Sequence, residues 1–178
     1  MDSLEGCEGA TVIIRSHGVG KAVYDELNAR GINYVDGTCP FVKKIHNIVR
    51  DNYENGKAII IVGDASHPEV KGINGWCENT AFIVNDPEEA VGLKLEDREY
   101  ALVVQTTFRE SKYEEILKII NEKNKTVSAN NTICSATEER QSEAVKISKN
   151  VDKMLVIGDK GSSNTQKLYE ICRKFCKN

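Results

Sequence analysis

Four short polar clusters combine imidazole, carboxyl, hydroxyl and amide side chains. They are Ser16-His17, His67-Pro68-Glu69, Thr106-Thr107 and Ser162-Ser163-Asn164. Such groups, together with the unpaired backbone N–H groups of a helix start, donate hydrogen bonds to phosphate oxygens. The clusters therefore predict a site for a small phosphate or diphosphate. Each cluster taken alone also fits a structural role, because Ser162 to Asn164 has the composition of an ordinary helix N-cap.

Glu69 follows His67 after a single proline, so a tight turn would aim both side chains into one pocket. A carboxyl group whose pKa is raised by burial can act as a proton donor. An exposed Glu at a helix start, where the helix dipole favours acids, is the structural alternative.

The chain has six cysteines and no C-x-x-C pair, which excludes a zinc ribbon or a ferredoxin-type cysteine run. Cys39 and Cys134 each precede a predicted helix, and a helix N-terminus favours the thiolate form that binds metals. Two thiolates do not complete a metal site, so two buried core thiols, or redox chemistry at one cysteine, remain alternatives. Cys172 and Cys176 are spaced as a buried pair on one helix face.

An internal repeat links the two cysteines. Cys39 precedes a helix and a strand that ends at Gly63-Asp64, and Cys134 stands at the same interval before Gly158-Asp159. A third copy of the cysteine would lie upstream of Met1. Three such thiolates about a pseudo-threefold axis would suit an iron–sulfur cluster with one iron open to substrate.

Composition narrows the class of protein further. The 178 residues carry a net charge of −3 with no basic block, which argues against a DNA- or RNA-binding protein. No apolar run approaches the roughly 20 residues that span a bilayer. Because no signal peptide follows Met1, we expect a cytoplasmic protein with reduced thiols.

These functional residues must be positioned by an α/β fold, because short β-branched runs alternate with amphipathic stretches along the whole chain. We predict strands at Thr11–Arg15, Tyr34–Asp36, Ala58–Val62, Ala81–Val84, Ala101–Gln105, Thr126–Ala129 and Lys153–Ile157. We predict helices at Lys21–Ala29, Phe41–Tyr53, Pro87–Leu93, Glu110–Asn121, Glu138–Lys149 and Asn164–Phe175. The segment after His67 is ambiguous, because Pro68 suits a first helical turn whereas Gly72 and Gly75 weaken a helix. In parallel sheets the ligand crevice lies beyond the carboxyl ends of the strands, where the polar clusters fall.

Taken together, these segments resemble one known family over essentially the whole chain. The matching segments are Ser16-His17-Gly18-Val19, Asp36-Gly37-Thr38-Cys39-Pro40, His67-Pro68-Glu69-Val70 with Gly72, Gln105-Thr106-Thr107, Ile133 to Thr137 with Arg140-Gln141, and Gly158 to Asn164. The family is the iron–sulfur 4-hydroxy-3-methylbut-2-enyl diphosphate reductases of the non-mevalonate isoprenoid pathway.

The resemblance implies a fold and a set of site residues. The fold would be a pseudo-threefold trefoil of parallel-sheet α/β units, here incomplete: residues 1–39 as the second half of one unit, 40–130 as a complete unit and 131–178 as the first half of a third. A [4Fe–4S] cluster would be held by Cys39, Cys134 and a third cysteine upstream of this chain. Glu69 would deliver protons with Thr106, and the diphosphate would be bound by His17, His67, Thr106, Ser162, Ser163 and Asn164.

The resemblance also implies the reaction. The substrate's hydroxyl group would be removed reductively with two electrons from a donor such as ferredoxin or flavodoxin, giving isopentenyl and dimethylallyl diphosphate. The family's first cluster cysteine and another histidine lie before Met1, and a serine-bearing loop lies beyond Asn178. Gly161 stands where many members carry Asn. We therefore expect these 178 residues alone to be inactive and to expose apolar faces. A non-catalytic phosphate-binding module with buried structural thiols is the alternative.

Overall fold

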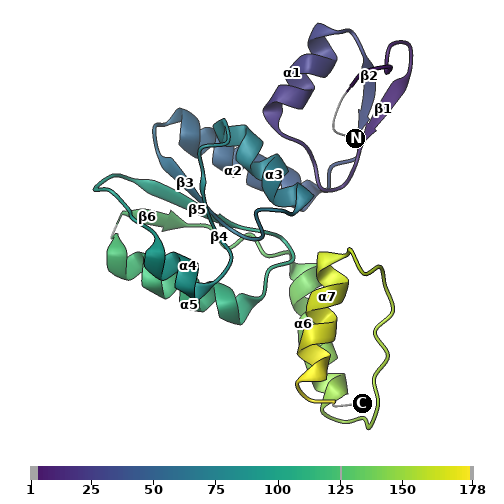
Figure 1. Cartoon of the computed structure of the whole chain (residues 1–178), viewed down its shortest axis with the longest axis vertical. Coiled ribbons are helices and arrows are strands. Elements are labelled where there is room, and N and C mark those ends of the chain that lie inside the picture. Colours follow the sequence, from purple (N-terminus) through teal and green to yellow (C-terminus); the bar gives the residue numbers. More distant parts are fainter. Residues whose placement is uncertain (1–3, 125, 177–178) are drawn as a thin grey trace.

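A computed structural model describes residues 4–124 and 126–176. Figure 1 shows three parts: a small unit at the N-terminal end, a central sheet covered on both faces by helices, and a pair of helices at the C-terminal end. Both sheets are parallel throughout, which confirms the α/β class.

The first part contains strand β1 (Thr11–Ile14), helix α1 (Lys21–Ala29) and strand β2 (Asn33–Asp36). The two strands pair in parallel, with Ile14 opposite Asp36. Leu27 of α1 and Ile14 of β1 are buried together in a small core. Ile13 and Val35, which are opposite each other in this sheet, are exposed, so one of its faces is uncovered.

The central part is a four-stranded sheet of order β4-β3-β5-β6. Its strands are β3 (Ala58–Val62), β4 (Phe82–Val84), β5 (Tyr100–Val104) and β6 (Val127–Ala129). Every residue of β3 and β5 is buried, as near-continuous apolar runs in the middle of a parallel sheet require.

Alternate side chains of β3 and β5 point to opposite faces of the sheet. Ile59 and Ile61 pack with helices α2 (Pro40–Glu54) and α3 (Pro68–Asn74). Ile60 and Val62 pack with helices α4 (Pro87–Gly92) and α5 (Glu110–Lys123). The ambiguous segment after His67 is thus helical, because Val70 and Ile73 bury one face against the sheet. A short 3₁₀ turn, η1 (Gly75–Cys77), follows it.

The loop after β1 is fixed against this central part by a close backbone contact. A side chain at Gly75 would place its Cβ 2.6 Å from the Cα of Gly20, so both positions require glycine. The Trp76 indole N–H donates to the carbonyl oxygen of Val19 (3.0 Å). The Trp76 ring stacks on the imidazole ring of His46. Burial lowers the pKa of His46 to about 4, so its imidazole is neutral at pH 7.

The third part is a helix pair, α6 (Ser135–Ser148) and α7 (Ser163–Arg173). Cys172 and Cys176 are buried in this part, as expected from their spacing. The strand predicted at 153–157 was wrong: these described residues form neither a strand nor a helix. Leu155 and Ile157 are 82% and 86% exposed. A strand needs a hydrogen-bonded neighbour, and no described strand lies beside this segment.

The described helices do not include one long and apolar enough to cross a membrane.

Candidate active site

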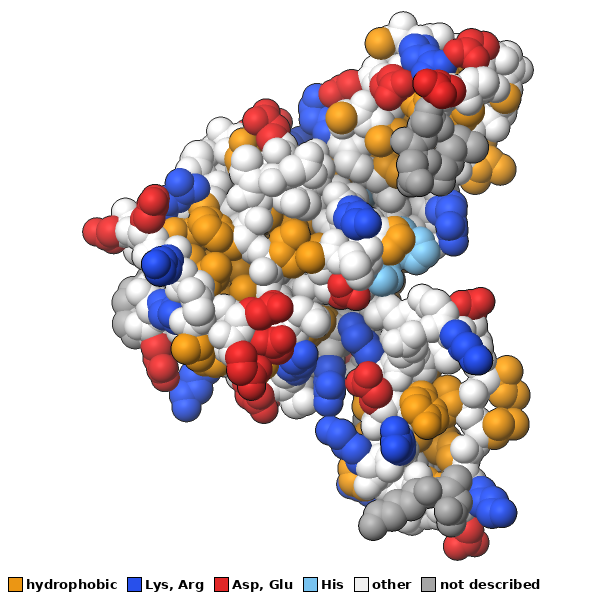
Figure 2. All heavy atoms as spheres, viewed as in Figure 1, with side chains coloured by type: hydrophobic (Ala, Val, Ile, Leu, Met, Phe, Trp, Pro, Cys, Tyr) orange, Lys and Arg blue, Asp and Glu red, His pale blue; other side chains and the backbone are white. Residues whose placement is uncertain are grey.

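The polar clusters come together in one cavity of about 700 Å³, where the three parts of the chain meet. All nine residues to which the resemblance assigns a role line it: His17, Cys39, His67, Glu69, Thr106, Cys134, Ser162, Ser163 and Asn164. In the space-filling view, histidine side chains lie where these parts approach one another (Figure 2). The parallel strands explain the convergence, since the loops after β1, β3 and β5 leave from the carboxyl ends of their strands.

Glu69 lies at the start of α3 and is only 3% exposed. Its two carboxyl oxygens are held by one residue: the Thr106 backbone N–H donates to Oε1 (2.7 Å), and Thr106 Oγ1 lies 2.8 Å from Oε2. Burial raises the pKa of Glu69, while the two hydrogen bonds from Thr106 act in the opposite direction. The carboxyl group therefore holds a proton to higher pH than an exposed glutamate does.

His67 is the N-cap of α3, and its Nδ1 accepts a hydrogen bond from the Glu69 backbone N–H (3.1 Å). An accepting Nδ1 places the proton of the neutral imidazole on Nε2. His17 lies edge-on to this ring, with 5.4 Å between the ring centroids. Burial and the charge of His17 lower the pKa of His67, so its neutral form prevails at pH 7 and offers one N–H donor.

The two cysteines occupy equivalent places, as the repeat predicted. Cys39 is the N-cap of α2 and Cys134 is the N-cap of α6. The Cys39 N–H donates to the Ser16 carbonyl oxygen (3.0 Å), and the Cys134 N–H donates to the Thr106 carbonyl oxygen (2.9 Å). Neither side chain caps its helix, so each is available for another interaction.

The loops that follow the repeated Gly-Asp pair are also equivalent. Oδ1 of Asp64 accepts the Ser66 N–H (2.8 Å), and Oδ1 of Asp159 accepts the Gly161 N–H (2.6 Å). The third residue after each aspartate, His67 or Ser162, is a helix N-cap. The loop geometry is therefore repeated although the second copy lacks its strand.

The start of α7 brings the last cluster into the cavity. Ser162 Oγ accepts the Thr165 N–H (3.3 Å), which makes Ser162 the N-cap. Ser163 Oγ lies 3.1 Å from Thr107 Oγ1, so this hydroxyl pair links α7 to the end of β5. Asn164 Oδ1 is buried without a hydrogen-bond partner among the described residues. Unpaired helix N–H groups next to hydroxyl and amide groups form an anion-binding surface.

Sequence reasoning missed several residues of the cavity wall. Arg15, Phe41 and Val42 line it as well. Arg15 directly precedes the Ser16-His17 cluster, so its position alone could have identified it. Arg140 also lines the cavity, from the second turn of α6, and the resemblance had included its segment without giving it a role.

The donor set suits part of an iron–sulfur site. Two thiols from equivalent helix starts face one cavity, and thiolate sulfur is the ligand that iron–sulfur clusters use. Within residues 4–124 and 126–176, however, no group of three or more His, Cys, Asp and Glu side chains is arranged to hold a metal ion. The described residues thus fit two ligands of a cluster.

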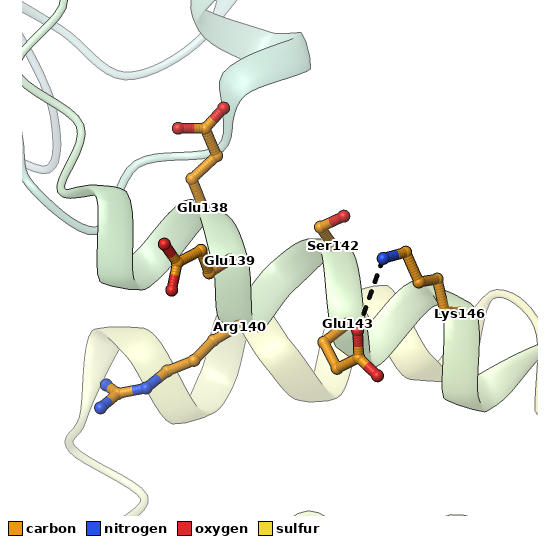
Figure 3. A pocket seen from close by; sticks show the side chains of 6 residues that line it. All are labelled: Glu138, Glu139, Arg140, Ser142, Glu143 and Lys146. Atoms are coloured by element: carbon orange, nitrogen blue, oxygen red, sulfur yellow. Dashed lines mark ion pairs between the residues drawn. The ribbon is translucent and has the colours of Figure 1, made fainter.

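A second hollow, of about 600 Å³, lies along α6. Figure 3 shows that its side chains, from Glu138 to Lys146, spread along one helix and do not converge, apart from the Glu143–Lys146 ion pair. Three of its six lining residues are glutamates, so it is a poor site for an anion.

The comparisons with known proteins agree over the whole chain. A family model described as LytB protein matches residues 1–178. A protein of Thermoanaerobacter sp. (strain X514) named 4-hydroxy-3-methylbut-2-enyl diphosphate reductase is 54% identical over 171 residues, which are 96% of this chain and 59% of that protein. One of the same name from Alkaliphilus oremlandii is 47% identical over 98% of this chain and 62% of its own length.

Solved structures give the same result. The E-1-hydroxy-2-methyl-but-2-enyl-4-diphosphate reductase of Plasmodium falciparum matches with a TM-score of 0.91 at 25% identity, over 98% of this chain and 56% of that one. A second structure, titled as (E)-4-hydroxy-3-methyl-but-2-enyl diphosphate reductase, the terminal enzyme of the non-mevalonate pathway, matches with a TM-score of 0.68 at 36% identity. The chain spans about three fifths of the length of these relatives.

Proposed function

The chain belongs to the LytB protein family, and on that premise we propose that it forms most of the active site of a 4-hydroxy-3-methylbut-2-enyl diphosphate reductase. The observation that carries the proposal is the convergence of a buried glutamate, two helix-capping cysteines and an anion-binding surface on one cavity. The alternative of a non-catalytic phosphate-binding module has no support from the relatives, which are named as reductases.

The proposed reaction replaces a hydroxyl group by hydrogen. The allylic C–O bond breaks, the oxygen leaves as water with one added proton, and a second proton goes to carbon. Two electrons balance these two protons, and a donor such as ferredoxin or flavodoxin supplies them. The products would be isopentenyl and dimethylallyl diphosphate. The division of the fold into units at residues 1–39, 40–130 and 131–178 is part of this proposal, as is a cytoplasmic location.

The diphosphate would lie against the donors that surround the start of α7. The Nε2–H of His67 points away from the capped helix end, and His17 stands beside it. Ser162, Ser163 and Asn164 add hydroxyl, amide and backbone donors on the opposite wall. Neutral donors of this kind hold an anion by hydrogen bonds without requiring a direct ion pair.

Glu69 and Thr106 would deliver the proton. Because Oε1 already accepts the Thr106 backbone N–H, the proton of a neutral Glu69 sits on Oε2, where it faces the Thr106 hydroxyl oxygen. That hydroxyl can then turn its own hydrogen toward the substrate's leaving oxygen. The pair forms a short relay from a buried acid to the cavity.

Cys39 and Cys134 would hold a [4Fe–4S] cluster, with the remaining ligand from outside the described residues, and the bound cluster supplies the electron transfer that breaks the C–O bond.

The test is an anaerobic reductase assay on the complete protein that the reading frame encodes, with the Glu69→Gln variant beside the wild type. We expect turnover of the diphosphate substrate by the wild type. The variant should lose about 100-fold or more in kcat while KM changes by less than about threefold, because a proton donor acts on the transition state. Equal losses of turnover and of diphosphate binding would remove the role of Glu69 as proton donor.

A further inference from the structure

Helix α7 contacts the segment that follows β5, Thr107 to Arg109, through three residue pairs in a row. Ser163, Lys167 and Glu170 lie on one face of α7. They meet three consecutive residues: Ser163 contacts Thr107 through the hydroxyl pair, the Lys167 ammonium lies 4.9 Å from the centre of the Phe108 ring, and Glu170 lies 3.6 Å from Arg109. Lys167 thus belongs to the middle one of the three pairs.

Among the described residues, none forms an ion pair with the Lys167 ammonium. It makes no hydrogen bond or ion pair within the part of the chain that the structure describes, although it is half-buried. The three carboxylates that act on its charge have other partners. Glu69 is held by Thr106, Glu170 lies 3.6 Å from Arg109, and Asp64 accepts the N–H and O–H of Ser66. Burial lowers the pKa of Lys167 to about 8, against the opposing effect of these carboxylates, so the group is mainly charged at pH 7.

Lys167 lies immediately behind the wall of the candidate active site. It lines a different cavity from the hollow along α6. This cavity has a volume of about 350 Å³ and lies between α7 and the start of α5. His67, Gly161 and Ser163 line both this cavity and the active-site cavity, so they form the wall between the two. The cavity that Lys167 lines therefore adjoins the anion-binding surface through these three shared residues.

We propose that Lys167 is a positioning residue for the substrate's diphosphate, which it attracts from behind this wall without contacting it. The inference rests on the proposed function, because it concerns the same anion site. Arg15 and Arg140 also line the active-site cavity, but both are exposed and water screens their charges. A half-buried charge is screened far less.

A purely structural role for Lys167, as packing on the Phe108 ring, is the competing explanation. Lys167→Met keeps a long apolar chain on the ring and removes only the charge, whereas Lys167→Arg keeps the charge. Lys118→Met is the matched control, because Lys118 is an exposed cation on α5 and forms no ion pair among the described residues. Thermal unfolding of each variant separates a loss of folding from a loss of binding.

The experiment titrates inorganic diphosphate into the full 178-residue chain at pH 7 and follows binding by calorimetry. Lys167→Met should weaken binding about tenfold at low salt, and the difference from wild type should shrink as salt is raised. Lys167→Arg and Lys118→Met should stay within about twofold of wild type. Unchanged binding by Lys167→Met, or a loss shared by Lys167→Arg, overturns the proposal.

A reductase assay on the complete protein separates this proposal from the proposed function. There, Lys167→Met should raise KM about tenfold with kcat kept, as expected for an interaction present in both ground and transition states. Diphosphate binding that depends on Lys167 in a protein without reductase activity would refute the proposed function and support this inference. An active enzyme whose KM is unchanged by Lys167→Met would support the proposed function and refute this inference.

Discussion

Replacing Thr106 by valine tests whether the buried Glu69 carboxyl depends on a single hydroxyl group. Valine keeps the branched shape of threonine and the backbone N–H that donates to Oε1, but it removes the hydrogen bond at 2.8 Å to Oε2. Glu69 is 3% exposed, so water cannot replace the lost partner without a change in structure.

The expected cost depends on the charge of Glu69. A buried hydrogen bond to a charged group is worth about 1.5–3 kcal/mol and a neutral one about 1 kcal/mol. We therefore expect Thr106→Val to lower the free energy of unfolding by about 1 kcal/mol where Glu69 is protonated and by about 2 kcal/mol where it is ionised.

The sign of this pH effect follows from linkage. The folded-state pKa of Glu69 is raised above its model value of 4.5 by burial, so the stability it contributes is present below 4.5 and is lost as pH rises through the folded pKa. The Thr106 hydroxyl opposes that shift, and its removal raises the folded pKa further. The penalty of Thr106→Val must therefore grow with rising pH.

Urea unfolding of wild type, Thr106→Val and Thr106→Ser at pH 4 and pH 7 measures these differences. Serine keeps the hydroxyl and loses only a methyl group, so its penalty should be about 1 kcal/mol and independent of pH. A penalty for valine that is equal at both pH values, or larger at pH 4, would refute the reasoning.

Two further predictions concern the metal ligands and the loop that carries His17. Cys39→Ser should remove most of the iron and labile sulfide from anaerobically reconstituted protein. Cys77→Ser should not, because Cys77 lies in the core away from the cavity. Equal iron and sulfide contents of the two variants in chemical analysis would contradict the ligand assignment. Gly75→Ala should lower the unfolding free energy by about 1–3 kcal/mol because its Cβ would overlap Gly20, whereas Gly92→Ala, which meets nothing within 4 Å, should not. Urea unfolding checks this pair, and similar values for both variants would exclude the backbone contact as the cause.

The sequence predicted the regular elements well where local patterns and burial agree. The apolar runs at Ala58–Val62 and near Tyr100–Val104 form the two central strands, because a parallel sheet covered on both faces buries every residue of such runs. The segment at 153–157 has a similar pattern but forms no strand in the described chain, because pairing depends on a neighbour that local sequence does not supply.

The candidate site was predicted because its residues follow the ends of strands and repeat along the chain. Cys39 and Cys134 were matched by the repeat alone, and both are helix N-caps. Their role as cluster ligands stays a prediction, as do the roles of the other site residues. The sequence could not show that Thr106 holds both oxygens of Glu69, because these residues lie on different strand ends and meet only across the sheet.

The sequence by itself therefore determined the α/β class, the repeat and the chemical identity of the site residues, since these depend on residue type and spacing. Only the tertiary structure decided that Glu69 is buried, which nitrogen of His67 carries the proton and that the Lys167 ammonium lies over the Phe108 ring. Those properties arise from contacts between segments far apart in the chain, and it is those contacts that set burial, hydrogen-bond partners and local charge.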